Sequence, residues 1–356
     1  MRLMLLPGDG IGPEIGAGLR HVLSAANDRF GLGLTLETAE VGLAALTKAG
    51  TTLPETVLEA ARGCEGIILG PLSTYEYPPA SEGGINASAA FRKELDLYAN
   101  IRPARTRPGV RAAASDMDLV VVRENTEGFY ADRTMFAGSG EFMPTEDLAL
   151  ALRKVSRAGS ARIARQACEL AMRRAKRLTI VHKANVLKLT DGLFHKTASK
   201  VAEEYREIEV DEVLVDAAAS LLVRQPSRFD VIVTTNMFGD ILSNLTAELS
   251  GGLGLAASLN AGDQYAMAQA SHGSAPDIAG RDVANPSSLI LSAAMLFDWL
   301  GRRNGVPDLR SAADAIERAV DGQLAEPAGR TRDLGGDFGT QAFAQAVADR
   351  LRAGHA

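Results

Sequence analysis

Two positively charged residues stand directly after apolar, strand-like runs of the sequence. Arg123 follows the run 119–122, and Lys183 follows the run 178–182. The carboxyl ends of parallel strands share one edge of a sheet, and ligands of α/β proteins bind along that edge. There an arginine could bind a carboxylate or phosphate through two parallel hydrogen bonds, and burial could lower the pKa of a lysine toward general-base use. The two positions indicate a site for an anionic substrate, although Lys183 alone fits a cap or an ion pair as well.

Arg123 belongs to a larger set of arginines in this part of the chain. The set comprises Arg92, Arg102, Arg105, Arg107, Arg111 and Arg123. Arg92 begins the segment 92–98, which is expected to lie on a helix, and Arg102 follows in Asn-Ile-Arg-Pro. A solvated surface position explains the three members between 105 and 111, but it explains Arg102 and Arg123 poorly.

Oxygen ligands for a divalent cation also follow apolar runs. Asp216 ends the run 213–216, and Asp240 and Asn244 stand one helical turn apart after the run 229–235. Mg²⁺ and Mn²⁺ prefer such carboxylate and amide oxygens, although Asp240 could instead cap a helix. The five histidines show no HxxxH spacing, which argues against zinc.

Two glycine-rich loops have open interpretations. The turn Gly8–Pro13 could cradle a phosphate at a helix start or be a tight structural turn, and Pro13 stands where the Rossmann fingerprint needs glycine. The loop His272–Gly280 carries Asp277, whose carboxylate could bind a ribose diol and repel a 2′-phosphate. An ordinary surface turn would explain this loop equally well.

Strand-length apolar runs alternate with helical patterns along the chain, which predicts a mostly parallel sheet covered by helices on both faces. The strands are expected at 3–6, 66–70, 118–122, 178–182 and 229–235. The helices are expected from 13 onward and at 146–176, 190–205 and 289–300. Turn-rich stretches at 100–110 and 250–254 suggest a second lobe inserted into the first.

The overall composition excludes several classes of protein. The 356 residues carry a net charge of −6 and two cysteines, which argues against nucleic acid as the main partner and against a disulfide framework. No apolar run is close to the length needed to span a membrane. The apolar run near residue 1 is too short for a signal peptide. We therefore expect a cytoplasmic α/β protein.

Six motifs in order resemble the isocitrate/isopropylmalate dehydrogenase family, in particular its NAD-dependent isocitrate/homoisocitrate-like members. They occupy residues 8–14, 95–103, 123–128, 182–186, 236–243 and 272–280, so the resemblance covers essentially the whole chain. It implies the two-lobed fold of isopropylmalate dehydrogenases, which is not of the Rossmann type. The expected lobes are 1–100 with 254–356, which would bind the cofactor, and 101–253, which would carry a dimerisation arm near 131–144.

The family catalyses metal-assisted oxidative decarboxylation of 2-hydroxy acids that bear a 3-carboxylate, and the resemblance assigns residues to its steps. Arg92, Arg102 and Arg123 would bind the substrate carboxylates, while Asp216, Asp240 and Asn244 would hold Mg²⁺ or Mn²⁺. Lys183 would take the hydroxyl proton as hydride leaves for the nicotinamide, and Tyr130 would protonate the resulting enolate. In the family Lys183 and Asp216 reach the site from the neighbouring subunit, which implies a homodimer with shared active sites.

The resemblance also implies a nicotinamide cofactor. Members that use NADP carry Lys-Tyr where this chain has Asp277-Ile278, which favours NAD. The residues expected at the cofactor are Thr74, Asn185, Gln269, His272, Gly273, Asp277, Ile278 and Asn285. Two of the relevant positions depart from the family, since Asn244 replaces an acid and Gln269 replaces a usual Glu. These changes raise the less favoured alternative of a non-catalytic regulatory subunit.

The segment before Arg92 bears on the substrate. Isopropylmalate enzymes place leucines there, whereas isocitrate enzymes place a Ser and an Asn, and this chain has Asn86 and Ser88 among small alanines. We therefore expect a polar group at C3 of the substrate, with isocitrate first. Homoisocitrate, 3-isopropylmalate, D-malate and tartrate remain alternatives, and the loop 75–82 fits no subgroup pattern.

Overall fold

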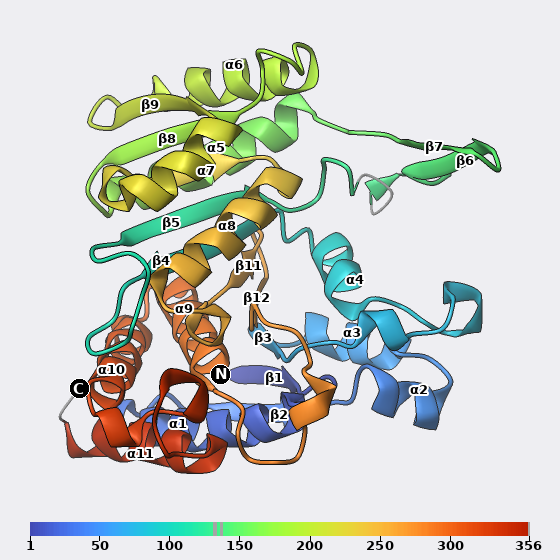
Figure 1. Cartoon of the computed structure of the whole chain (residues 1–356). Coiled ribbons are helices and arrows are strands. Elements are labelled where there is room, and N and C mark those ends of the chain that lie inside the picture. Colours follow the sequence, from blue (N-terminus) through green and yellow to red (C-terminus); the bar gives the residue numbers. More distant parts are fainter. Residues whose placement is uncertain (131–133, 136–137, 355–356) are drawn as a thin grey trace.

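The computed structural model describes residues 1–130, 134–135 and 138–354. In this part of the chain ten strands form one sheet in the order β2-β1-β3-β12-β11-β4-β5-β10-β8-β9 (Figure 1). The sheet is mostly parallel, with antiparallel pairing where β11 meets β12 and β4, and where β4 meets β5. The strands are β1 (Arg2–Leu6), β2 (Thr35–Thr38), β3 (Gly66–Leu69), β4 (Ala99–Arg105), β5 (Asp118–Glu124), β8 (Arg177–His182), β9 (Glu209–Leu214), β10 (Val231–Thr234), β11 (Leu259–Ala261) and β12 (Ala266–Gln269).

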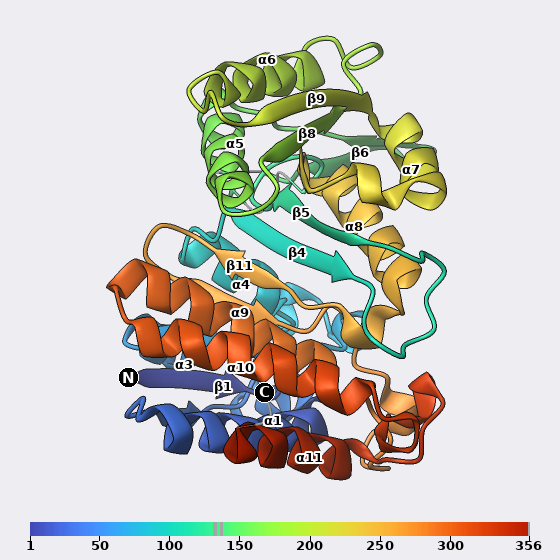
Figure 2. The same ribbon diagram turned by 90° about the vertical axis from the view of Figure 1, so that its left-hand side faces the viewer.

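Helices cover both faces of the sheet, which confirms the predicted fold class. They are α1 (Gly12–Phe30), α2 (Leu43–Ala49), α3 (Glu55–Arg62), α4 (Ala87–Glu94), α5 (Arg157–Met172), α6 (Thr190–Ala202), α7 (Val215–Arg224), α8 (Asn236–Ser250), α9 (Ser287–Asn304), α10 (Pro307–Leu324) and α11 (Thr340–Ala353). Figure 2 shows α9 and α10 side by side on one face, with α1 and α11 packed together nearby. Pro13 in the first turn of α1 and the left-handed Gly31 after its end explain the bounds of that helix.

The alternation of side chains along each strand divides the core into two layers. In β1, Leu3 and Leu5 pack with α1 and α9–α11, while Met4 and Leu6 pack with α3 and α4. In β5, the residues 120 and 122 pack against α5 and α6, and the residues 119 and 121 pack against α7 and α8. Helices α4 and α8 therefore lie on one face of the sheet, and α5, α9 and α10 lie on the other.

The strand order groups β1, β2, β3, β11 and β12 at one end of the sheet and β4, β5, β8, β9 and β10 at the other. This grouping follows the same division of the chain as the two expected lobes, 1–100 with 254–356 and 101–253. The strands nevertheless form a single continuous sheet, so the lobe boundaries remain a proposal.

The predicted helix 146–176 is wrong in its first part. β6 (Glu141–Thr145) and β7 (Leu148–Ala151) form a hairpin that projects from the body (Figure 1). Helix α5 begins only at Arg157, where the Ser156 hydroxyl accepts the Gly159 N–H at 3.0 Å. Leucine and alanine alternate over 148–152, and this period of two fits a strand better than a helix.

The same region contains the expected arm at 131–144, but residues 131–133 and 136–137 of that arm lie outside the described part of the chain. One smaller difference concerns the end of a helix, since α6 ends at Ala202 rather than 205. Asp216 follows strand β9, as expected, and lies in the first turn of α7. Among the described residues, no helix combines the length and apolar character needed to span a membrane.

Candidate active site

The centre of the candidate site is a carboxylate held by two arginines from neighbouring strands. Arg102 extends from β4, Arg123 lies near the end of β5, and Asp240 comes from the second turn of α8. Asp240 Oδ1 accepts Nη1 of Arg102 at 3.2 Å and also forms an ion pair with Nη1 of Arg123. Arg123 is only 3% exposed, and its Nε and Nη2 donate to Asn236 Oδ1 at 3.1 and 2.6 Å. The structure thus brings together three of the residues predicted from sequence.

Gly239 allows α8 to approach this closely. A Cβ atom at this position would lie 2.6 Å from both Cβ and Cγ of Arg123, so any side chain would push the helix away from β5. The helix would then carry Asp240 and Asn236 away from the two arginines. The absence of a side chain at Gly239 is therefore one condition for Asp240 to reach the two arginines.

The charge balance of the cluster favours an anion. Among the described residues, the carboxylate of Asp240 pairs with two guanidinium groups, both of them largely buried. Burial lowers the pKa of Arg102, and the neighbouring Asp240 opposes that shift. A second negatively charged group would offset the desolvation of the arginines, as a substrate carboxylate would.

Helix α4 places two further predicted substrate residues, Ser88 and Arg92, against Gln269. The Ser88 hydroxyl donates to Gln269 Oε1 at 2.9 Å, and Arg92 Nη2 lies 3.4 Å from the same oxygen. Gln269 was expected at the nicotinamide ribose, and here its side-chain oxygen contacts predicted substrate-binding residues. Asn86 is the N-cap of α4, because its Oδ1 accepts the Ala89 N–H at 3.1 Å.

A chain of buried amides, which sequence reasoning missed, joins these elements across the sheet. Asn260 Nδ2 lies 3.4 Å from Gln269 Oε1, and Asn260 Oδ1 accepts Asn125 Nδ2 at 3.0 Å and Asn100 Nδ2 at 3.2 Å. These asparagines are fully buried, so their hydrogen bonds fix β11 against β4 and the end of β5. No sequence pattern shows which buried strands will be neighbours.

Lys183 and Asp216 form a separate pair. Lys183 Nζ donates to Asp216 Oδ1 at 2.6 Å, and this contact lowers the pKa of the Asp216 carboxyl. In the described part of the chain neither side chain contacts the cluster of Arg102, Arg123 and Asp240. Tyr130, by contrast, lies close to that cluster, since the guanidinium carbon of Arg123 is 6.0 Å from its ring centroid.

Several of the residues expected at the cofactor lie on or beside two loops, one near Thr74 and one near His272, and a hydrogen bond joins these loops. The Ser73 hydroxyl, next to Thr74, donates to the Ser274 hydroxyl at 2.8 Å. His272 Nδ1 lies 2.9 Å from the carbonyl of Gly273, which places the ring proton on Nδ1. Its Nε2 is buried and has no hydrogen-bond partner among the residues that the structure describes, and burial lowers the pKa of the ring. A buried, neutral acceptor of this kind fits a ligand that brings its own donor.

The other cofactor candidates are placed as follows. Asp277 and Ile278 lie on the short helical turn Pro276–Ile278, where Asp277 is exposed. Asn285 Oδ1 accepts the N–H of Ser287 at the start of α9, and its Nδ2 donates to Asp333. Gly273 is exposed, and Asn185 lies in the turn that follows Lys183. These positions are compatible with a nucleotide at the loop, and their roles remain predictions.

The turn Gly8–Pro13 is a tight structural turn, the second of its two interpretations. The N–H groups of Asp9 and Ile11 donate to the carbonyls of Pro71 and Ser274, both at 2.8 Å, and the N–H of Gly12 closes the turn on Asp9. Gly8 and Gly10 have φ values of 75° and 57°, and a Cβ at Gly10 would lie 1.9 Å from the Ser274 carbonyl oxygen. These N–H groups are therefore not available to a phosphate.

The fold brings His182, His195 and Glu212 together, although their sequence spacing gave no metal motif. His182 Nδ1 accepts the N–H of Ala184 at 3.0 Å, so the proton of the neutral ring is on Nε2, 3.0 Å from Glu212 Oε1. A metal ion at Nε2 would require the proton to move to Nδ1, where it would face that N–H. The cluster is better explained as a carboxylate that bridges two imidazoles, with His195 Nε2 at 2.7 Å from Glu212 Oε2.

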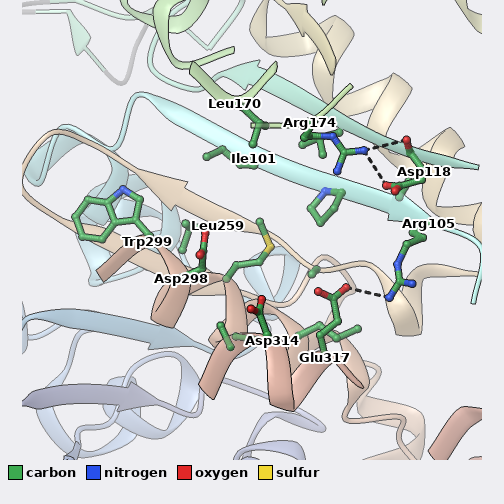
Figure 3. Close-up of a pocket in the computed structure, with 18 of the residues that line it drawn as sticks. Ile101, Arg105, Asp118, Leu170, Arg174, Leu259, Asp298, Trp299, Asp314 and Glu317 are labelled. Atoms are coloured by element: carbon green, nitrogen blue, oxygen red, sulfur yellow. Dashed lines mark hydrogen bonds and ion pairs between the residues drawn. The ribbon is translucent and has the colours of Figure 1, made fainter. Parts of the chain in front are cut away.

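A cavity of about 580 Å³ lies on the opposite face of the sheet, between α5, α9 and α10 (Figure 3). Most of its charged side chains pair with one another, as Arg105 does with Glu317 at 3.1 Å and Arg174 with Asp118 at 2.8 Å. The arginines predicted to bind substrate, Arg102 and Arg123, meet Asp240 on the α8 face instead.

The fold and the arginine–aspartate cluster define an α/β enzyme that acts on an anionic substrate. The chain belongs to the isocitrate/isopropylmalate dehydrogenase family, whose model matches residues 2–347. This confirms the prediction from the motifs, and the chain is an oxidative decarboxylating dehydrogenase.

Individual relatives differ in the substrate that their names give. The chain is 44% identical over 354 residues to the isocitrate/homoisocitrate dehydrogenase of Thermus thermophilus, covering 99% of this chain and 98% of the relative. It is 40% identical over 352 residues to the 3-isopropylmalate dehydrogenase of Methanothermobacter thermautotrophicus, with coverage of 99% and 98%. The crystal structure of isocitrate dehydrogenase from Methylococcus capsulatus matches with a TM-score of 0.86 and 42% identity, covering 99% of each chain.

Proposed function

We propose that this protein catalyses the NAD-dependent, Mg²⁺- or Mn²⁺-dependent oxidative decarboxylation of a 3-carboxylated 2-hydroxy acid, with isocitrate as the favoured substrate. The observation that carries the proposal is the convergence of Arg102 and Arg123 on Asp240. Arg92 and Ser88 on α4 would complete the surface that binds the carboxylates. Because the arginines are already held by Asp240 and Asn236, little side-chain freedom would be lost when the substrate binds.

The oxygens near the arginines fit a divalent cation. Asp240 directs Oδ1 to both arginines, whereas its Oδ2 makes no hydrogen bond to the described residues. Asn244 is exposed one turn later on α8, so its amide oxygen is also available. A bound Mg²⁺ or Mn²⁺ would act as a Lewis acid on the substrate oxygens. With Asn244 in place of an acid, the set carries one negative charge less, and we expect weaker metal binding.

Lys183 and Asp216 would act in the site of a second copy of the chain. Their separation from the arginine cluster supports a homodimer in which each protomer supplies this pair to its partner. Lys183 would accept the proton of the substrate hydroxyl, and Tyr130 would donate a proton after decarboxylation. The exposed apolar side chains Phe142, Met143, Leu148 and Leu150 of the β6–β7 hairpin would be covered in such a dimer.

NAD is favoured over NADP by the charge of the loop after β12. The exposed carboxylate of Asp277 would accept hydrogen bonds from a ribose diol and would repel a 2′-phosphate, and the neighbouring Ile278 supplies no cation. The unpartnered Nε2 of His272 would accept a hydrogen bond from the nucleotide. If NADP were preferred to NAD in kcat/KM, the role of Asp277 would be wrong.

A second candidate substrate is 3-isopropylmalate, because relatives with that name match almost as well. The polar Ser88 and the small alanines around it favour a polar C3 group instead. The test measures NADH formation with Mn²⁺ and a panel of isocitrate, homoisocitrate, 3-isopropylmalate, D-malate and tartrate. We expect the highest kcat/KM for isocitrate. Faster turnover of 3-isopropylmalate would refute the substrate assignment, and no turnover of any acid would favour a non-catalytic subunit.

A further inference from the structure

We propose that Arg153 is a positioning residue that fixes the three segments carrying Tyr130, Lys183 and Asp240 to one another. Its catalytic consequence rests on the proposed function, which assigns those three residues their roles. Arg153 lies between the β6–β7 hairpin and α5, and its side chain is 8% exposed. No motif singled it out, because it stands apart in sequence from every segment that it contacts.

The first contact leads to the loop of Lys183. Arg153 Nη1 lies 2.5 Å from Oδ1 of Asp191, which is fully buried in the first turn of α6, and 3.1 Å from the Thr190 hydroxyl. The other oxygen of Asp191, Oδ2, accepts the backbone N–H of Lys183 at 2.6 Å. The buried carboxylate therefore connects the guanidinium of Arg153 to the backbone from which the Lys183 side chain extends.

The second contact leads to the start of α8. Arg153 Nη2 donates to the hydroxyl of Thr235, the N-cap residue of α8, at 3.0 Å. Its guanidinium carbon also lies 5.2 Å from the ring centroid of Phe238, two residues before Asp240. These interactions fix the first turn of α8 and, through it, the position of Asp240.

The third contact leads to the loop of Tyr130. The guanidinium carbon lies 5.6 Å from the ring centroid of Phe129, the residue before Tyr130. A planar guanidinium can interact with aromatic rings while its nitrogens donate in several directions within its plane. A lysine ammonium could preserve the charge beside Asp191, but it could not reproduce the bonds to both threonines and the two aromatic contacts.

The experiment compares Arg153→Lys with the matched variant Arg174→Lys. Arg174 also pairs with a buried carboxylate, since its Nε lies 2.7 Å from Oδ1 of Asp230, but it lines the cavity on the opposite face. Amide hydrogen exchange followed by mass spectrometry reads the backbone directly and needs no activity. In Arg153→Lys we expect faster exchange in the segments 183–191 and 235–240, and no such change in Arg174→Lys.

Steady-state kinetics with isocitrate, NAD and Mn²⁺ provide the second readout. We expect kcat of Arg153→Lys to fall about tenfold or more, because misplaced reacting groups cost rate, while KM changes by less than about threefold. Equal exchange in both variants, or unchanged exchange in Arg153→Lys, would overturn the proposal, as would unchanged kcat. If the wild type turns over no acid, the proposed function fails, but hydrogen exchange still decides whether Arg153 holds the segments.

A second variant covers the case in which Arg153→Lys does not fold because Asp191 has lost its partner. Phe238→Leu leaves every charge in place and removes one of the aromatic contacts. We expect a smaller rise in exchange at 235–240 and a fall of about threefold in kcat. Wild-type exchange and wild-type kcat in this variant would refute a positioning role for the aromatic contact.

Discussion

Arg123→Lys is the substitution that tests the candidate site most directly. The Nε and Nη2 groups of Arg123 donate to Asn236 Oδ1, at 3.1 and 2.6 Å, and Nη1 donates to Asp240. A lysine ammonium could keep the pair with Asp240 but would lose the planar contact with Asn236. Because a hydrogen bond from a charged donor contributes about 1.5–3 kcal/mol, we expect the free energy of unfolding to fall by about 3 kcal/mol.

The effect on catalysis should exceed what the loss of stability explains. If Arg123 also binds a substrate carboxylate, a single ammonium replaces a two-pronged donor in the transition state, and kcat/KM for isocitrate should fall about 100-fold. Initial rates of NADH formation with saturating Mn²⁺ and NAD would measure this, on samples shown to be folded by their melting temperature.

Arg105→Lys is the matched control on the neighbouring strand β4. Arg105 pairs with Glu317 and Asp321 near the surface of the opposite face, so the same exchange should cost about 1 kcal/mol or less and leave kcat/KM within about twofold. If Arg123→Lys retained kcat/KM within about threefold of the wild type, or if both variants lost activity equally, the assignment of Arg123 to the substrate would be refuted.

Three further predictions concern the cofactor, pH and assembly. Asp277→Lys should raise the ratio of kcat/KM for NADP to that for NAD at least about tenfold, because it replaces a repelling charge by an attracting one; an unchanged ratio would show that the loop does not read the 2′-position. Since burial lowers the pKa of His272 from 6.5, the native state resists protonation, and the free energy of unfolding should fall as the pH drops from about 7 toward 5. In His272→Gln the free energy of unfolding, measured by denaturant titrations at several pH values, should depend less on pH. An unaltered pH profile would show that His272 is not the cause of the dependence. Replacing Phe142, Met143 and Leu150 by serine should convert a dimer to monomers in light scattering, whereas a dimer of unchanged stability would place the interface elsewhere.

The sequence predicted the central strands well because their apolar runs are continuous and buried on both faces. The run at 118–122 lies within β5, and that at 178–182 within β8. The prediction lacks the hairpin at 141–151, although leucine and alanine alternate over 148–152, because this strand pattern is short and adjoins the longer helical pattern of α5. Periodicity indicates which residues could be buried, and it cannot show what would bury them.

A residue of the candidate site could be predicted where its own sequence motif also shows whether it lies at the end of a strand or on a helix. Arg123 and Asp240 are such cases, and they meet as expected. The amide chain through Asn260, the bridge between His182 and His195, and the network of Arg153 depend on which strands become neighbours in the sheet. That order places β11 beside β4, although β11 follows β4 by more than 150 residues, and no local pattern contains this information.

The alternation of side chains along one strand explains why Arg102 and Arg105 have different roles. They stand three residues apart on β4, so they must point to opposite faces of the sheet. Arg102 meets Asp240 on the α8 face, and Arg105 meets Glu317 and Asp321 on the α10 face. The net charge of −6 therefore says little about the substrate. In the proposed function an anion is selected by the arginines on the α8 face. Whether an arginine of β4 lies on that face depends on whether its position along the strand is odd or even.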